Sequence, residues 1–147
     1  MGAPWRNTKV KRDKTDDVFS FLVRERAQWF CERCGIGFAH NPGSLHCSHF
    51  FGRANQGTRW HPMNAAAHCV GCHDHLGAEP ILFAEWVKGR YGEEYYNRLR
   101  VMAHKVTKIS KFEKELIHKH YLAEKKRLLE LRLAGRVGRL EFTYVGG

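Results

Sequence analysis

The stretch MNAAAHCVGCHDHLG at residues 63–77 decides the fold, because it contains the second of two Cys-x-x-C pairs in the chain. The four cysteines of these pairs are Cys31, Cys34, Cys69 and Cys72. Two pairs of this spacing typically bring four thiolates to one tetrahedral zinc ion, so we predict a structural zinc site. A redox pair, or cysteines that are merely buried, are the alternatives, and each leaves the other pair unexplained.

The segment between the two pairs is longer than the ~15 to 20 residues of an ordinary zinc ribbon, which indicates an insertion. Its sequence LHCSHFF at residues 45–51 is prone to form a strand, and the two glycines of GRANQG then interrupt it. We expect a second short strand at residues 58–60, followed by a loop that enters a short helix ending at Gly77. The predicted order is therefore strand, strand, helix.

Helices are predicted on both sides of this segment. The sequence TDD at residues 15–17 offers N-cap chemistry for a helix that runs towards the first cysteine pair. Pro80 favours the first turn of a further helix, which Gly92 should interrupt. The sequence SKFE at residues 110–113 is a capping-box signature for a helix of about 24 residues, which Gly135 should close.

Together these elements predict an α+β fold that is mainly helical. We expect a basic flexible arm at residues 1–14, a helix and a zinc-bracketed module at residues 15–78, and a basic helical region at residues 79–147.

The composition points to a polyanionic partner. The chain has 25 Lys and Arg against 15 Asp and Glu, a net charge of +10, so nucleic acid is the first candidate. Most of the excess lies at residues 100–139, where twelve basic residues face four acidic ones. No apolar stretch is long enough for a membrane span, and the N-terminus has no apolar signal region, so we expect a soluble, cytoplasmic protein.

Histidines cluster around the cysteine pairs. Six of the ten in the chain lie within residues 46–75, at positions 46, 49, 61, 68, 73 and 75. A histidine that is neutral near pH 7 can take a proton from an attacking water, and a divalent ion can offset the charge that develops during phosphodiester hydrolysis. The order His49, Asn64, His73 within residues 31–77 resembles the HNH, or His-Me finger, nucleases.

The HNH resemblance implies a ββα-metal finger bracketed by the four-cysteine zinc site. It implies that His49 is the general base, that Asn64 holds its imidazole in place, and that His73 ligates a catalytic divalent ion, Mg²⁺ or Mn²⁺. Ser48 stands where family members often have a second metal ligand. Three neighbours remain candidates for completing the ligand shell, namely His46, Cys47 and His75.

The resemblance extends over residues 18–121 to the phage NinG, or Rap, recombination nucleases. It is carried by VFSFLVRERAQWFCERCG, HCSHFFGR, TRWHPMNAAAHCVGCHDHLG, FAEWVKGRYGEEYYNRL and ISKFEKELIHKHY. His73 departs from this family, which more often has Asn there. The resemblance implies structure-selective nicking of branched DNA such as D-loops and four-way junctions, in the cytoplasm of a bacterial host if the chain is phage-encoded.

Arg53 and Arg59 flank the loop after the first strand and are candidate DNA-phosphate ligands, because guanidinium donors match phosphate oxygens. Charge that merely solubilises the loop is the alternative. A homodimer through the long C-terminal helix and a monomer that folds this helix onto its own core both fit the sequence. Two rival functions remain: a zinc-stapled DNA-binding module without catalysis, and an HNH nuclease of restriction, homing or packaging type.

Overall fold

The computed structural model describes residues 10–146, so most of the predicted basic arm, residues 1–9, lies outside the described residues, as does Gly147. The fold is mixed α+β and mainly helical, as predicted. Its helices are α1 (Lys14–Arg26), α2 (Val70–Ala78), α3 (Pro80–Tyr91), α4 (Glu93–His104) and α5 (Lys111–Leu133), and its strands are β1 (Leu45–His49) and β2 (Ala65–Cys69). Two short 3₁₀ turns precede the strands, at Pro42–Ser44 and Pro62–Asn64.

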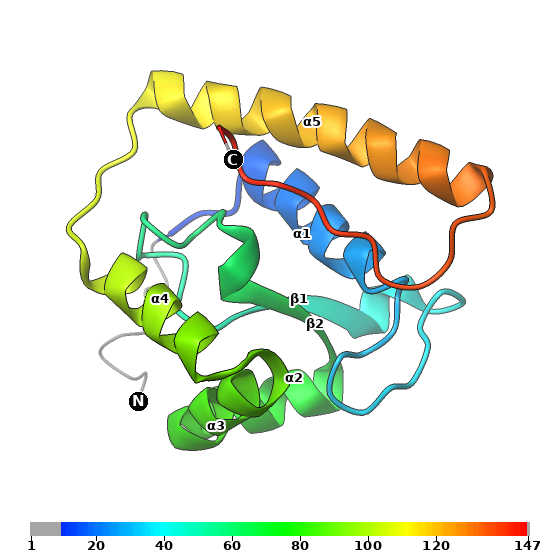
Figure 1. Cartoon of the computed structure of the whole chain (residues 1–147), viewed down its shortest axis with the longest axis horizontal. Helices are drawn as coiled ribbons and strands as arrows, with labels where there is room; N and C mark the ends of the chain where they lie inside the picture. The colour runs from blue at the N-terminus through cyan, green and yellow to red at the C-terminus, as the bar shows by residue number, and fades with distance from the viewer. Residues whose placement is uncertain (1–9, 147) are drawn as a thin grey trace.

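The two strands form an antiparallel pair in the middle of the molecule. Leu45 lies opposite Cys69, and His49 lies opposite Ala65. Figure 1 shows α1 and α5 on one side of this pair and α2 and α3 on the other. Because strand side chains alternate between faces, Cys47 and His49 face α1, whereas Ser48 faces α3.

The second strand does not lie where the sequence predicted it. Residues 58–60 form a turn, because the amides of Thr58 and Arg59 both donate to the Asn55 carbonyl, at 3.3 and 2.9 Å. The strand instead begins at Ala65, within the stretch expected to be a loop. Alanine is a weak strand former, but small side chains are needed where a strand is covered on both faces, and residues 65–67 are all buried.

Helix α1 begins two residues earlier than predicted, with Asp13 as its N-cap. The Asp13 carboxylate accepts from the amides of Thr15 and Asp16, and Asp16 reciprocates to complete a capping box. The buried face of the helix includes Phe19 and Leu22, which are fully inaccessible to solvent. This face packs against α5 and forms the largest hydrophobic core of the protein.

The C-terminal helices begin where the sequence indicated. Pro80 opens α3, Gly92 separates α3 from α4 with a φ of 100°, and a capping box between Ser110 and Glu113 opens α5. After α5 the chain reverses at Gly135, whose φ of 93° favours glycine. It then returns between α1 and α5, as the red segment of Figure 1 shows.

Helix α5 therefore packs onto the core of its own chain. Ile117, Tyr121 and Leu128 are buried against α1, whereas Leu133 is 89% exposed. None of the helices in residues 10–146 has the length and apolar character that crossing a membrane requires.

Candidate functional site

The four paired cysteines meet at one point, between the segment after α1 and the start of α2. Their sulfur atoms all lie within 4.8 Å of one another, and the Cys34 and Cys69 sulfurs are 3.9 Å apart. A tetrahedral zinc with Zn–S bonds of about 2.3 Å places its sulfurs about 3.8 Å apart. The cluster can therefore hold a metal ion, and its dimensions are consistent with structural zinc, as the sequence predicted.

Local hydrogen bonds form the turn that presents the first two sulfurs. The Cys31 amide donates to the Ile36 carbonyl, and the Gly35 amide donates back to the Cys31 carbonyl, both at 2.9 Å. Gly35 has a φ of 78°, a conformation that side chains disfavour. The second pair is presented differently, because Cys69 ends β2 and Cys72 lies in the first turn of α2.

The thiols of the cluster differ in acidity. Burial opposes ionisation of Cys31, but backbone donors at Cys34, Cys69 and Arg33 outweigh it and lower its pKa to about 7. Burial raises the pKa of Cys72 to about 12, and the neighbouring Cys69 and Cys31 sulfurs contribute to the rise. Four negative sulfurs this close together require a cation, which is the chemistry of a zinc site.

Glu32 joins the first cysteine pair to the sheet. Its amide donates to the Ala67 carbonyl, and its carboxylate accepts from the Ala67 amide, each at 2.8 Å. Ala67 thus has both main-chain groups satisfied on the edge of β2 that β1 does not cover. The same carboxylate accepts from the Tyr91 hydroxyl at 2.7 Å and from Arg139 at 2.9 Å. Glu32 therefore connects the first cysteine pair to the end of α3 and to the C-terminal segment.

A hollow of about 560 Å³ lies along the other edge of the sheet, next to the cysteine cluster. Its lining combines residues of α1, β1 and α2 with the loop after β1. The ionisable groups in that lining are three histidines, three arginines and one thiol: His46, His49, His73, Arg12, Arg24, Arg53 and Cys47. Among the described residues, no carboxylate lines it, so the hollow is suited to an anion.

His49 ends β1 and is oriented by the loop that follows. Its Nε2 lies 3.1 Å from the Arg59 carbonyl, an acceptor, so Nε2 carries the proton and Nδ1 keeps a free lone pair. The ring packs against Phe19 at 5.7 Å between centroids. Burial lowers the pKa of His49 to about 4, so the imidazole is neutral at pH 7. A neutral, fixed imidazole with one free lone pair can accept a proton.

Asn64 is fully buried and binds the chain two residues beyond His49. Its Oδ1 accepts from the Phe51 amide and its Nδ2 donates to the Phe51 carbonyl, both at 2.8 Å. The Asn64 carbonyl also accepts from the Phe50 amide at 2.9 Å. The side chain therefore fixes the exit of β1, and it does not form the expected hydrogen bond to the His49 ring.

His73 lies in the first turn of α2, and its partner in the hollow is His46. The two ring centroids are 5.2 Å apart, at an interplanar angle of 70°. Two imidazoles this close can ligate one divalent ion. The Nδ1 of His73 lies 3.8 Å from the exposed Asp74 carboxylate, and burial lowers the pKa of His73, which favours the neutral, ligating form.

The other candidates for the ligand shell are placed differently. Ser48 is 1% exposed and faces α3, away from the hollow. His75 lies outside the hollow on the surface of α2, 2.8 Å from the Glu79 carboxylate. Cys47 lines the hollow, but burial raises its pKa to about 12, so it remains a neutral thiol. Among these neighbours, the structure brings only His46 next to His73.

The two arginines singled out in the sequence also differ. Arg53 lines the hollow, 3.7 Å from the Asp16 carboxylate, and its buried Nη1 has no hydrogen-bond partner in the described part of the chain. Arg59 makes two bonds to the buried Asp16 carboxylate, at 3.0 and 2.6 Å, and stacks over Trp60. Arg59 does not line the hollow, and its side chain is only 12% exposed.

Sequence reasoning missed two contributions from the N-terminal side. Arg12 lines the hollow from just before α1, and Arg24 lines it from the last turn of that helix. No local pattern marks them, because their role depends on how α1 crosses the sheet. His46 was recognised only as one of three possible ligands. Its signal is its position opposite His68 and beside α2, which requires the register of the strands.

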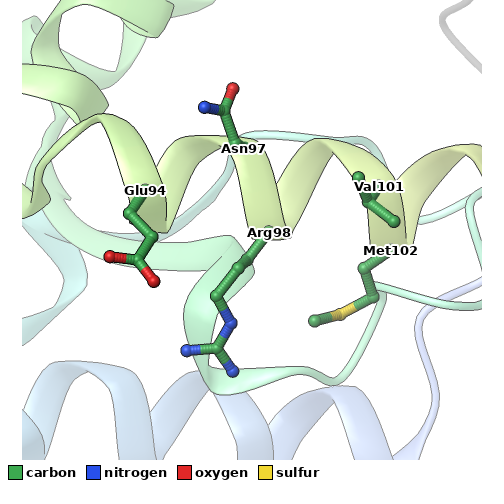
Figure 2. A pocket seen from close by; sticks show the side chains of 5 residues that line it. All are labelled: Glu94, Asn97, Arg98, Val101 and Met102. Carbon is green, nitrogen blue, oxygen red and sulfur yellow. The ribbon is translucent and has the colours of Figure 1, made fainter.

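A larger hollow, of about 600 Å³, lies on the surface of α4 (Figure 2). It is lined by Glu94, Asn97, Arg98, Val101 and Met102. This open helix face contains none of the predicted site residues.

Comparison of the chain with models of known families, with curated proteins and with solved structures gives no match.

Proposed function

We propose that this protein is a metal-dependent DNA endonuclease, with β1, β2 and α2 acting as a ββα finger of the HNH type. One observation carries the proposal. A single hollow beside the four-cysteine cluster gathers the neutral His49, the His46–His73 pair and three arginines, with no carboxylate in its described lining. The order of the two strands and the helix, and the resemblance of residues 31–77 to HNH nucleases, point to the same chemistry.

In the proposed reaction, a phosphodiester enters the hollow with Arg53 beside its non-bridging oxygens. Nδ1 of His49 takes the proton of an attacking water while the new O–P bond forms and the bond to the leaving oxygen breaks. The leaving oxygen takes a proton from solvent. Asn64 holds the backbone that carries His49, so the base keeps its position without contacting the substrate.

His46 and His73 would hold the catalytic divalent ion, Mg²⁺ or Mn²⁺. When bound, such an ion offsets the negative charge that develops on the phosphate and on the leaving oxygen. The two histidines leave positions open for water and for phosphate oxygens, which these ions prefer.

Nicking of supercoiled plasmid tests the activity. The zinc-loaded protein, with Mg²⁺ or Mn²⁺ added, should convert supercoiled to open-circular DNA, and His49→Ala should slow this by about 10² to 10⁴. His104→Ala is the matched control, because His104 is an exposed histidine on α4. A wild-type protein that binds DNA but cuts none at any metal concentration would instead be a zinc-stapled DNA-binding module.

We further propose that the substrate is branched DNA, as the resemblance to the phage recombination nucleases suggests. Cleavage rates on linear duplex, single strand, flap, D-loop and four-way junction would separate this role from that of a restriction, homing or packaging nuclease. We expect the D-loop and the junction to be cut faster than the linear duplex. Equal rates on all five substrates would contradict the recombination role.

A further inference from the structure

Two cations, Arg24 in the lining of the hollow and Lys125 on α5, lie over aromatic rings, and neither has an anionic partner among the described residues. The guanidinium of Arg24 lies 4.8 Å from the centroid of the Trp29 ring, and the ammonium of Lys125 lies 4.4 Å from that of Phe21. Phe21 and Trp29 contact each other edge to face, at 5.8 Å between centroids. The four side chains therefore form one continuous row of contacts from the lining of the hollow to α5.

Neither cation is neutralised within the part of the chain that the structure describes. Arg24 donates to the Ser20 carbonyl at 3.1 Å and forms no ion pair, and Lys125 forms none either. This differs from Arg12, whose charge is offset by Asp17, and from Arg59, which binds Asp16. Burial lowers the pKa of Arg24, and the nearby charge of Arg12 acts in the same direction. An anion beside Arg24 would offset both effects, because an opposite charge favours the charged guanidinium.

The aromatic rings give this row its second property. Phe21 and Trp29 are each half-buried, so part of each residue reaches solvent. Cations placed beside aromatic rings bind nucleic-acid strands, because phosphates contact the charges and bases stack on the rings. The cations are also held in place by their cation–π contacts, which reduces the entropy lost when a strand binds.

We propose that Arg24, Trp29, Phe21 and Lys125 form a track for the DNA strand that leaves the hollow, running over α1 to α5. The proposal rests on the proposed function for the identity of the strand as DNA. The track would hold the strand by backbone charge and by stacking, without reading its sequence.

The test is the salt dependence of binding, measured without Mg²⁺ or Mn²⁺ so that no cleavage occurs. Fluorescence anisotropy of a labelled single strand of about 16 nucleotides would be followed over a range of salt concentrations. Replacing both cations, in Arg24→Gln with Lys125→Gln, should weaken binding at low salt. A plot of the logarithm of the association constant against the logarithm of the salt concentration has a negative slope. The double variant should also make this slope shallower by about 1.4, which corresponds to two lost phosphate contacts.

The matched control removes the same charge elsewhere, in Lys88→Gln with Arg100→Gln. Lys88 also lies over an aromatic ring, that of Tyr96 at 4.7 Å, but on α3. The control and a conservative pair, Arg24→Lys with Lys125→Arg, should both keep the wild-type slope, and thermal melts would verify that each variant folds. An unchanged slope in Arg24→Gln with Lys125→Gln, called the glutamine pair below, would overturn the track. An equal loss of slope in the control variant would also overturn it.

Failure of the track and failure of the nuclease give different results. A wild-type protein that cuts plasmid, with a glutamine pair that binds like wild type, removes the track and leaves the nuclease. A wild-type protein that cuts nothing, with a glutamine pair whose salt slope falls as expected, removes the nuclease and leaves the track.

Discussion

The proposed general base owes its protonation state to its surroundings. His49 packs against Phe19 in the main core, and its one described hydrogen bond goes to the Arg59 carbonyl. An exposed imidazole has a pKa of about 6.5 and is partly charged at neutral pH. Burial lowers the pKa of His49 to about 4, so at neutral pH the ring is uncharged and its lone pair is available.

The pKa of His49 can be measured directly. We expect its ring Cε1–H signal, assigned with His49→Ala, to stay at the neutral position between pH 8 and pH 5.5 in a ¹H–¹³C NMR titration. An ordinary imidazole would be mostly charged at the lower limit.

The same pKa shift makes stability depend on pH. Because the pKa of His49 is lower in the folded state than in the unfolded state, the unfolded chain binds one more proton at pH values between the two pKa values. His49 therefore makes the free energy of unfolding decrease as pH falls from about 6.5 towards 4, and leaves it unchanged above. An NMR titration midpoint near pH 6.5 for the His49 ring would contradict the argument that burial lowers its pKa.

Asn64 acts on the backbone, and its replacement should therefore affect stability first. Asn64→Ala leaves the Phe51 amide and carbonyl without their partners in a half-buried turn, which should lower the free energy of unfolding by roughly 2 to 4 kcal/mol. Asn64→Asp keeps one acceptor but sets a carboxylate oxygen against the Phe51 carbonyl, so we expect it to be no better. Urea unfolding measures both. Asn97→Ala, at an exposed amide on α4, is the control and should change stability by less than about 0.5 kcal/mol. Wild-type stability in Asn64→Ala would show that the turn does not need its side chain.

At the scale of elements, the four-cysteine cluster connects the turn after α1 to the point where β2 ends and α2 begins. One pair lies in the turn after α1, and the other spans the junction of β2 and α2. Without a common ion, the two segments would be joined mainly through Glu32 and Ala67. We infer that zinc binding and folding of the ββα segment are coupled.

A variant that loses the metal ion should therefore also lose its folded structure. We expect about one zinc per chain by elemental analysis, and Cys72→Ser should lose both the zinc and the cooperative unfolding transition. Cys47→Ala is the matched control, because Cys47 is a half-buried cysteine outside the cluster. It should keep the zinc. Folded, cooperative Cys72→Ser without metal would disprove the structural role.

Local signals in the sequence predicted the elements that local chemistry defines. The capping box at Ser110 and the break at Gly92 were correctly placed, because these residues act on their own helix ends. The second strand was not, because residues 65–67 are alanines whose strand conformation depends on long-range packing by α1 and α2. The role of His46 was left open for the same reason, since only the strand register places it beside His73.

At the scale of the whole molecule, the C-terminal segment joins parts that are distant in sequence. The Leu140 amide donates to the Arg26 carbonyl at 3.1 Å, where α1 ends. Further along, the Thr143 amide donates to the Glu124 carboxylate of α5 at 2.9 Å. Between these two bonds, Phe142 is 3% exposed and contacts the rings of Phe19 and Tyr121 edge to face. The segment thus completes the core behind His49.

Removing the Phe142 ring should consequently weaken the whole fold. We expect Phe142→Ala to lower the free energy of unfolding by about 3 to 5 kcal/mol, because it opens a cavity between α1 and α5. Leu133→Ala removes an apolar side chain of the same C-terminal region that is 89% exposed, and should cost less than about 0.5 kcal/mol. Chemical unfolding of the zinc-loaded protein gives both values. If the two variants were equally stable, the segment would lie on the surface without contributing to the core, and the position of Phe19 behind His49 would have to be maintained by α1 and α5 alone.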